Sequence, residues 1–164
     1  MIPLPQVLHI LGWEQLRLLP DLDAGGKATI GWGHLILPGE DLHREITRAE
    51  AHALFLRDLQ EKEAQVHRAL PVVAGLGTPW RLTEDQWGTL VAFCYNTGTE
   101  PLSGANGLGK ALREGRYGDV PAEMRRWVYV TDKAGKKVKS AGLSARREDE
   151  VALWQRSGVG SEER

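Results

Sequence analysis

Two carboxylates and a hydroxyl lie close together near the start of the chain. Glu14 precedes Asp23 by nine residues, and Thr29 follows Asp23 by six. Cleavage of a glycosidic bond needs a proton donor on one side of the bond and a carboxylate on the other, and the gap between them decides whether a water fits. Glu14 and Asp23 could meet that need. Carboxylates at this spacing are common by chance, so the pair alone favours the simpler interpretation of two solvated surface acids.

The elements around these residues would bring them together by local chain geometry. Apolar residues recur at helical spacing from Leu4 to Leu11 and predict a first helix over about residues 4–12, with Glu14 at its C-terminal end. Turn-forming residues then surround Asp23, and an alternating run leads through Thr29. We therefore expect a small β-hairpin or three-stranded sheet over about residues 17–37.

The whole string resembles the phage-type lysozymes, or endolysins, of glycoside hydrolase family 24. Their pattern is a Glu, eight residues, an Asp, five residues, a Thr, and then I-G-x-G-H, which runs here without a gap from Glu14 to His34. The resemblance implies that Glu14 is the general acid, and that Asp23 and Thr29 hold the water that attacks the sugar from the opposite face. Gln15 departs from the pattern, since the family usually has Gly after the acid.

A long helix is predicted over about residues 48–69, opened by the T-x-x-E capping-box spacing of Thr47 and Glu50. Asp58 lies on its apolar face and therefore calls for a partner, for which His34 is the candidate. The run I-T-x-x-E-A-x-x-L-F-x-x-D, ending at Asp58, is similar to one in T-even phage lysozymes, whose Asp pairs with the His of the G-H motif. We assign His34 and Asp58 to a structural pair, which should lower the pKa of Asp58.

A Pro- and Gly-rich connector over residues 71–82 precedes a second capping box at Thr83, which opens a helix ending near Asn96. The stretch L-x-x-x-Q-x-x-x-L-x-x-F-x-x-N-x-G, ending at Gly98, again resembles the endolysin pattern. Asn96 either faces the cleft and touches the sugar chain or serves as the helix C-cap. We assign Asn96, together with Gly31 and Trp32, to substrate binding.

The C-terminal part of the chain predicts a short helix ending at Gly115, a helix over 119–130 that contains Trp127, an exposed hairpin over 128–140 and a last helix from Gly142 to about Arg156. The four lysines of the hairpin either bind anionic wall polymer or form a solvated basic turn. Residues 157–164 read as a frayed tail.

The last helix opens with G-L-x-x-R-R-x-x-E, which matches the family pattern and ends at Glu150. One of its two arginines, Arg146 or Arg147, could pair with Glu14. The alternative makes both arginines donors in surface ion pairs.

Composition narrows the class of protein. The chain has 164 residues, of which 41% are hydrophobic and 26% charged, as in one globular domain with a sizeable core. Its net charge of -1 offers no general attraction to nucleic acid. The lone Cys94 cannot form an internal disulfide, and the spacing of His, Cys and carboxylates suggests no metal site. We also expect no membrane span, no cofactor, no signal peptide and a monomer.

We therefore expect an α+β, mostly helical, two-lobed lysozyme-like fold over residues 1–164. A small β-containing lobe (about 13–46) and a helical lobe (about 80–156, with the N-terminal helix) would be joined by the helix at 48–69. The resemblance implies hydrolysis of the β-1,4 bond between N-acetylmuramic acid and N-acetylglucosamine in peptidoglycan glycan strands. Such a protein would be made in the host cytoplasm and reach the wall through a holin. A lytic transglycosylase and a non-catalytic wall-binding protein are the alternatives.

Overall fold

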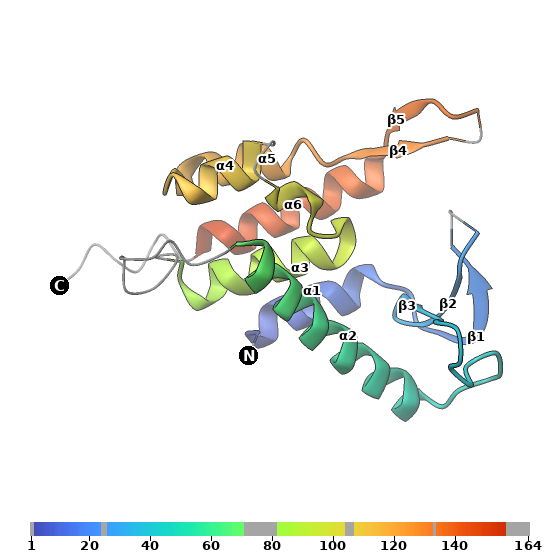
Figure 1. Cartoon of the computed structure of the whole chain (residues 1–164). Helices are drawn as coiled ribbons and strands as arrows, with labels where there is room; N and C mark the ends of the chain where they lie inside the picture. The colour runs from blue at the N-terminus through green and yellow to red at the C-terminus, as the bar shows by residue number, and fades with distance from the viewer. Residues whose placement is uncertain (1, 24–25, 71–81, 104–106, 133, 157–164) are drawn as a thin grey trace.

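The computed structural model describes residues 2–23, 26–70, 82–103, 107–132 and 134–156 (Figure 1). Most of the connector expected at 71–82, and the whole of the tail expected at 157–164, lie outside these residues. Within them the chain is mostly helical, with a three-stranded sheet at one end and a separate two-stranded hairpin. The α+β, mostly helical class predicted from the sequence is confirmed.

The first helix, α1 (Leu4–Trp13), ends one residue before the catalytic candidate Glu14, which is its C-cap. Its start is fixed by Pro5 in the first turn, a position where the missing N–H of proline costs nothing. Glu14 adopts an extended conformation, φ −92° and ψ 127°, while its N–H still donates to Ile10 O at 3.0 Å. The backbone therefore leaves the helix at the residue whose side chain is of interest.

The sheet consists of β1 (Arg17–Leu22), β2 (Ala28–Gly31) and β3 (His34–Leu35), antiparallel and in that order. Its register places Thr29 opposite Asp21, with an irregularity in β1 between Arg17 and Asp21. One face of the sheet packs on a small apolar cluster formed by Ile30, Ile36, Ile46 and Ala51. This cluster holds the sheet against the start of the next helix.

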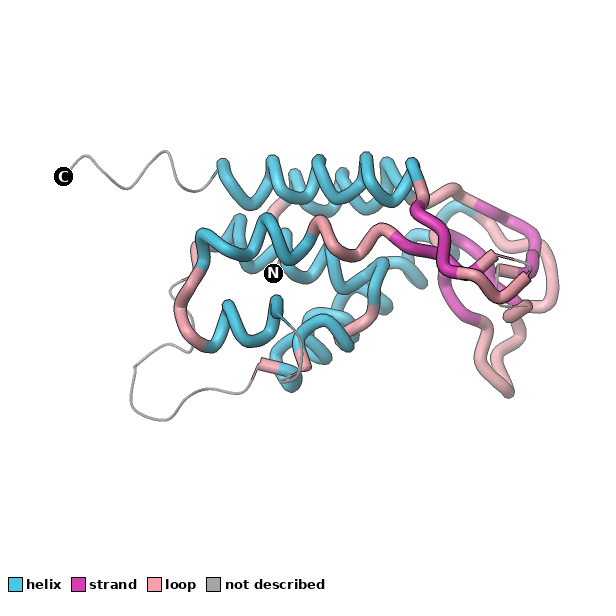
Figure 2. Tube along the Cα trace, turned by 90° about the horizontal axis from the view of Figure 1, so that it is seen from above, coloured by secondary structure: helices cyan, strands magenta, loops and turns pink. Residues whose placement is uncertain are grey.

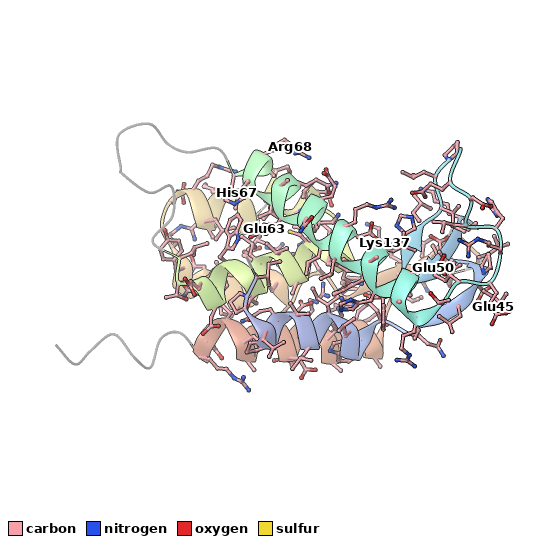
Figure 3. All side chains as sticks on the ribbon, turned by 90° about the horizontal axis from the view of Figure 1, so that it is seen from below. Glu45, Glu50, Glu63, His67, Arg68 and Lys137 are labelled. Atoms are coloured by element: carbon pink, nitrogen blue, oxygen red, sulfur yellow. The ribbon has the colours of Figure 1, made fainter. Side chains whose placement is uncertain are left out.

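Helix α2 (Arg48–Ala69) runs from this sheet to the other helices (Figure 1). The predicted capping box is present: Thr47 Oγ1 accepts from Glu50 N at 3.1 Å, and Glu50 Oε2 accepts from Thr47 N at 2.7 Å. Figure 3 shows Glu50 at the sheet end of α2 and Arg68 at the opposite end. Phe55, Leu59 and Val66 bury the intervening face in the main core.

The helical lobe surrounds α3 (Glu84–Thr97), which is buried without a break from Gly88 to Cys94 and packs against α1, α2 and α6. Its capping box at Thr83 is also as predicted. The absence of a side chain at Gly88 lets α1 approach closely, since a Cβ there would lie 2.7 Å from Pro3 Cδ. The remaining helical elements are η1 (Glu100–Leu102), α4 (Gly107–Arg113), η2 (Tyr117–Asp119), α5 (Val120–Met124) and α6 (Ala141–Arg156).

The prediction of a helix over 119–130 is wrong for the second half of that range. Helix α5 ends at Met124, and Trp127 follows it in a turn in which its N–H donates to Met124 O at 3.1 Å. The chain then enters β4 (Tyr129–Thr131), which pairs with β5 (Lys137–Lys139) to form the expected hairpin. The β-branched residues after Trp127 favour a strand, and the partner strand supplies the hydrogen bonds.

The hairpin β4–β5 and the sheet β1–β2–β3 extend from the helices in the same direction (Figure 1). Seen from above, the hairpin overlies the sheet (Figure 2). No helix in the part of the chain that the structure describes is long and apolar enough to cross a membrane.

Removing the hydroxyl of Thr47 should destabilise the protein. Thr47→Ala deletes the acceptor for Glu50 N–H, a loss that typically costs about 1 kcal/mol of unfolding free energy. Thr47→Ser keeps the oxygen and is the matched control. Urea denaturation of the three proteins tests this expectation, and equal midpoints for the Ala and Ser variants would contradict it.

Candidate active site

The side chain of Glu14 is held in a fixed direction at the edge of the helical lobe. Its Oε1 accepts from Arg146 Nη1 at 2.7 Å, and 23% of the side chain is exposed. Its Oε2 lies against Gly33, where an added Cβ would be 3.6 Å away and where φ is +87°. Glycine is therefore favoured at position 33 by the backbone conformation.

The two arginines of α6 have different partners, which resolves the alternatives left by the sequence. Arg146 pairs with Glu14, whereas Arg147 Nη2 donates to Asn96 Oδ1 at 2.8 Å. Both arginines also contact Glu150, a fully buried carboxylate, at 3.4 Å from Arg146 Nε and 3.0 Å from Arg147 Nη2. The interpretation of both as surface ion-pair donors is wrong, because both are buried.

Burial affects the titration of Arg147. Removal from water lowers the pKa of its guanidinium, and Glu150 opposes that effect. The planar group also lies over the ring of Phe93, 4.7 Å from its centroid, in a cation–π contact. Asn96 is thereby fixed by its oxygen, and its NH₂ group is the donor that remains. Asn96 lies within α3 and is not the C-cap, which is Gly98.

Asp23 directly follows β1, and Thr29 lies on the neighbouring strand β2. Asp23 Oδ1 accepts from Lys27 N at 2.8 Å, and Asp23 N donates to Lys27 O at 2.9 Å, so the turn between β1 and β2 fixes this residue. Thr29 Oγ1 donates to Asp21 O at 3.3 Å. With its hydrogen used in this way, the hydroxyl presents its oxygen as an acceptor.

These residues meet at one cleft of about 490 Å³. Its lining includes Glu14, Asp23, Thr29, Gly31 and Asn96, each of which was proposed from the sequence. Residues that the sequence analysis did not assign to the site also line it: Gln15, Arg17, Leu22, Ile30, Gly33 and Tyr95. The position of Tyr95 directly before Asn96 in the α3 motif was the available signal for that residue.

Gly31 and Trp32 were both assigned to substrate binding, but they differ in position. Gly31 lines the cleft with φ +66°, and an added Cβ would lie 3.6 Å from Ala51 Cβ. Trp32 is not among the described residues that line the cleft. Its ring packs edge-on against Phe55 and its carbonyl accepts from Tyr95 Oη at 3.1 Å. Burial raises the pKa of Tyr95, so the phenol remains a donor at neutral pH.

His34 is buried at the contact between β3 and α2. Its Nδ1 lies 2.9 Å from Asp58 Oδ2, the contact expected from the sequence. Its Nε2 lies 3.0 Å from Glu40 Oε2 and 3.1 Å from Arg57 Nη2, and Arg57 also donates to Glu40. The sequence analysis missed Glu40 and Arg57. The spacing of Glu40, shortly after the Pro38–Gly39 turn, could have suggested a carboxylate folded back toward His34.

The pKa values of the two carboxylates beside His34 are shifted in opposite directions. Desolvation by burial raises the pKa of Asp58 and outweighs the His34 contact, so the predicted lowering is wrong. The hydrogen bond from Leu37 N and the contact with His34 lower the pKa of Glu40 to about 2. The helical pattern placed Asp58 on an apolar face, but it could not show how far the carboxylate is removed from water.

Among the described residues no group of three or more His, Cys, Asp or Glu side chains could hold a metal ion. A carboxyl group held by an arginine faces the same space as a second carboxylate and a hydroxyl.

The comparisons with known proteins agree with this geometry. The family model for phage lysozyme matches residues 11–150, and the chain belongs to this family. No curated protein sequence matches the chain.

Solved structures with the same fold include an endolysin from Escherichia coli O157:H7 phage FAHEc1. It is 28% identical, with a TM-score of 0.78 over 96% of this chain and 94% of that one. The muramidase domain of SpmX from Asticaccaulis excentricus is 27% identical, with a TM-score of 0.76 over 94% of this chain and 97% of that one. The P1 phage endolysin Lyz, at 18% identity and a TM-score of 0.73 over 99% of this chain and 88% of that one, shares the fold.

Glu40 should make stability depend on pH in acid. Its folded pKa, about 2, lies below its ordinary value of 4.5, so its stabilising contribution is present above about pH 4.5 and is lost as the pH falls toward 2. Glu40→Gln should therefore have a lower melting temperature than the parent at pH 5, and the difference should shrink between pH 4.5 and 2. Melting curves across this range test it.

The exposed carboxylate Glu45 provides a matched control for this series. Glu45→Gln removes the same charge at an exposed position away from His34, so it measures how much of the change in melting temperature comes from the charge alone. A melting-temperature difference for Glu40→Gln that is constant from pH 5 to 2 would contradict the role assigned to Glu40.

Proposed function

We propose that the protein is an endolysin, a muramidase that hydrolyses the β-1,4 bond between N-acetylmuramic acid and N-acetylglucosamine in peptidoglycan. One observation carries the proposal: Glu14, held by Arg146, shares a cleft with Asp23 and Thr29. Membership of the phage lysozyme family supports a peptidoglycan-lytic glycosidase. The likeness to structures described as an endolysin and a muramidase domain supports the same activity.

Glu14 is the general acid in this mechanism. Its protonated carboxyl donates to the glycosidic oxygen as the bond breaks, which makes the departing sugar a neutral alcohol. The carboxylate that remains accepts from Arg146, so the charge left by the proton has a fixed counterion. Arg146 is thus a positioning residue, since it acts on the sugar only through Glu14.

Asp23 and Thr29 position the attacking water. Thr29 donates to Asp21 O, so its oxygen accepts one hydrogen of the water. The carboxylate of Asp23 accepts the other hydrogen and takes the proton as the water attacks. With both hydrogens engaged, the water directs a lone pair at the anomeric carbon on the face opposite Glu14. This arrangement predicts inversion of the anomeric centre.

Two other functions are compatible with the fold but less well supported. A lytic transglycosylase would use Glu14 and need no positioned water, because the muramic acid's own hydroxyl closes the ring. A non-catalytic wall-binding protein would be expected to have lost one of the three cleft residues, yet all three line the cleft. Synthesis in a host cytoplasm, release through a holin and action as a monomer form part of the same proposal.

Replacing Glu14 by Gln should lower wall hydrolysis by at least about 100-fold, since general acid catalysis typically contributes 10²–10⁴. The amide oxygen still accepts from Arg146, so the melting temperature should be unchanged or raised. The assay uses permeabilised cells, with the released muropeptides identified by mass. Glu61→Gln, an exposed carboxylate on α2, is the control and should retain full activity. Substantial activity in Glu14→Gln would remove this residue from the mechanism.

The stereochemistry of the product tests the roles of Asp23 and Thr29. An inverting enzyme releases the α-anomer first, before mutarotation mixes the two forms. NMR of the product in the first minutes of reaction should therefore show the α-anomer. An initial β-anomer would indicate a covalent intermediate, and a 1,6-anhydro sugar would indicate transglycosylation. Either result would overturn the assignment of Asp23 and Thr29 as water holders.

A further inference from the structure

A buried histidine contacts the ionic network that holds Glu14 but takes no part in the mechanism proposed above. His9 lies on α1, five residues before Glu14, and 6% of its side chain is exposed. Helices α1 and α6 run side by side (Figure 3), and His9 Nε2 lies 3.5 Å from Oε1 of Glu150 on α6. This nitrogen forms no hydrogen bond with any residue that the structure describes. The ring therefore adds a titratable group to the network.

Glu150 Oε1 connects His9 to the catalytic candidate. The same oxygen lies 3.4 Å from Arg146 Nε and 3.0 Å from Arg147 Nη2, and Arg146 in turn donates to Glu14 at 2.7 Å. One fully buried carboxylate thus faces two arginines and a histidine, the side chain whose charge ordinarily changes between pH 5 and 8. Charges in such an interior are screened much less than in water, so a proton on His9 affects the whole network.

The other charged groups around His9 do not replace Glu150 as its partner. On α6, Asp149 and Arg156 have opposite charges and line the same groove as His9, with a volume of about 450 Å³. On α3, Asp85 accepts from the amide of Gln6 at 3.3 Å. Among the described residues this groove and the catalytic cleft share no lining side chain. His9 can therefore exchange a proton with solvent while a sugar chain occupies the cleft.

We propose that His9 is a positioning residue for the catalytic acid, which keeps its proton while the His9 ring is uncharged and loses it more readily when the ring is protonated. The proposal rests on the proposed function, in which Glu14 must be protonated to act. With His9 charged, three cations share Glu150, so Glu150 neutralises less of the charge of Arg146. Arg146 then stabilises the carboxylate of Glu14 more strongly. Protons on His9 and on Glu14 thus oppose each other.

The dependence of activity on pH tests this role. His9→Gln keeps a polar side chain of similar size that cannot become charged. The ratio of its activity to that of the parent should be near one at about pH 8, where His9 of the parent is uncharged. Near pH 6 the variant should be about two- to tenfold more active, and the ratio should fall back toward one as the pH approaches about 4, where Glu14 is protonated in both proteins. A purely structural role would change activity by one factor at every pH, and a constant ratio would overturn the proposal.

The matched control is His43→Gln, which removes a histidine from an exposed position. Its activity should equal that of the parent at every pH. The same rise near pH 6 in both variants would indicate a general effect of positive charge and would contradict the role of His9.

The reverse effect is measured without any hydrolysis and with His9 intact. Coupling between two sites is reciprocal, so removing the charge of Glu14 must make His9 take up its proton at a lower pH. The Cε1–H signal of His9 is followed by NMR from pH 5 to 8 in the parent and in Glu14→Gln. Its midpoint should be lower in Glu14→Gln by about 0.3 to 1 pH unit, which corresponds to the same two- to tenfold effect. Equal midpoints would show that the two groups are not coupled.

This proposal and the proposed function fail in different ways. If the parent hydrolyses peptidoglycan but the His9 midpoint is the same in Glu14→Gln, His9 has no part in positioning the acid and the proposed function stands. If the midpoint differs as expected but the parent does not hydrolyse peptidoglycan, the coupling of His9 to Glu14 is supported and the catalytic assignment is wrong.

Discussion

The candidate active site depends on a buried ionic network to which α6 contributes three charged residues, Arg146, Arg147 and Glu150. Glu150 has no exposed surface and contacts both Arg146 and Arg147, which in turn hold Glu14 and Asn96. Taking such charges out of water costs several kcal/mol per ion, and hydrophobic residues could often replace them without loss of stability. Their effect here is on orientation: two arginines of a single helix direct the carboxylate of Glu14 and the amide of Asn96, which both line the cleft.

The other side of the cleft depends on a different network. His34 joins β3 to α2 through Asp58 and to the following turn through Glu40, so the sheet that carries Asp23 and Thr29 is attached to the long helix. We regard this joining role of His34 and Asp58 as a proposal. Two glycines with positive φ, Gly31 and Gly33, let the strand pass close to Ala51 and to Glu14. Glu14 and the pair Asp23 and Thr29 are thus supported by separate contacts.

Local signals in the sequence were sufficient for the elements they govern directly. Both capping boxes, at Thr47 and Thr83, begin helices as predicted, because the pattern itself makes the hydrogen bonds. The helix expected over 119–130 failed for the opposite reason. The β-branched residues at 130 and 131 favour a strand, but the hydrogen bonds of a strand come from its partner, here residues 137–139, which the helical pattern could not show.

The site residues divide in the same way, into those that a local motif predicts and those that depend on contacts between distant parts of the chain. The order of Glu14, Asp23 and Thr29 could be read from a motif, but the choice of Arg146 over Arg147 depends on how α6 is rotated against α1, which no spacing reveals. Trp32 shares the motif of Gly31, yet its ring packs against Phe55, because it lies in the turn after β2, where the motif does not fix the direction of a side chain. The raised pKa of Asp58 depends on burial, which a sequence pattern cannot measure.

The contact between Glu14 and Arg146 spans 132 residues of chain. A protein is synthesised from its N-terminus at about 5–20 residues per second, so the segment with the acid leaves the ribosome well before α6 exists. During that interval Glu14 has no arginine to direct it, and Asn96 has none to hold its amide. A nascent chain therefore carries every residue of the catalytic motif in an unassembled form, and the last helix to be translated completes the site.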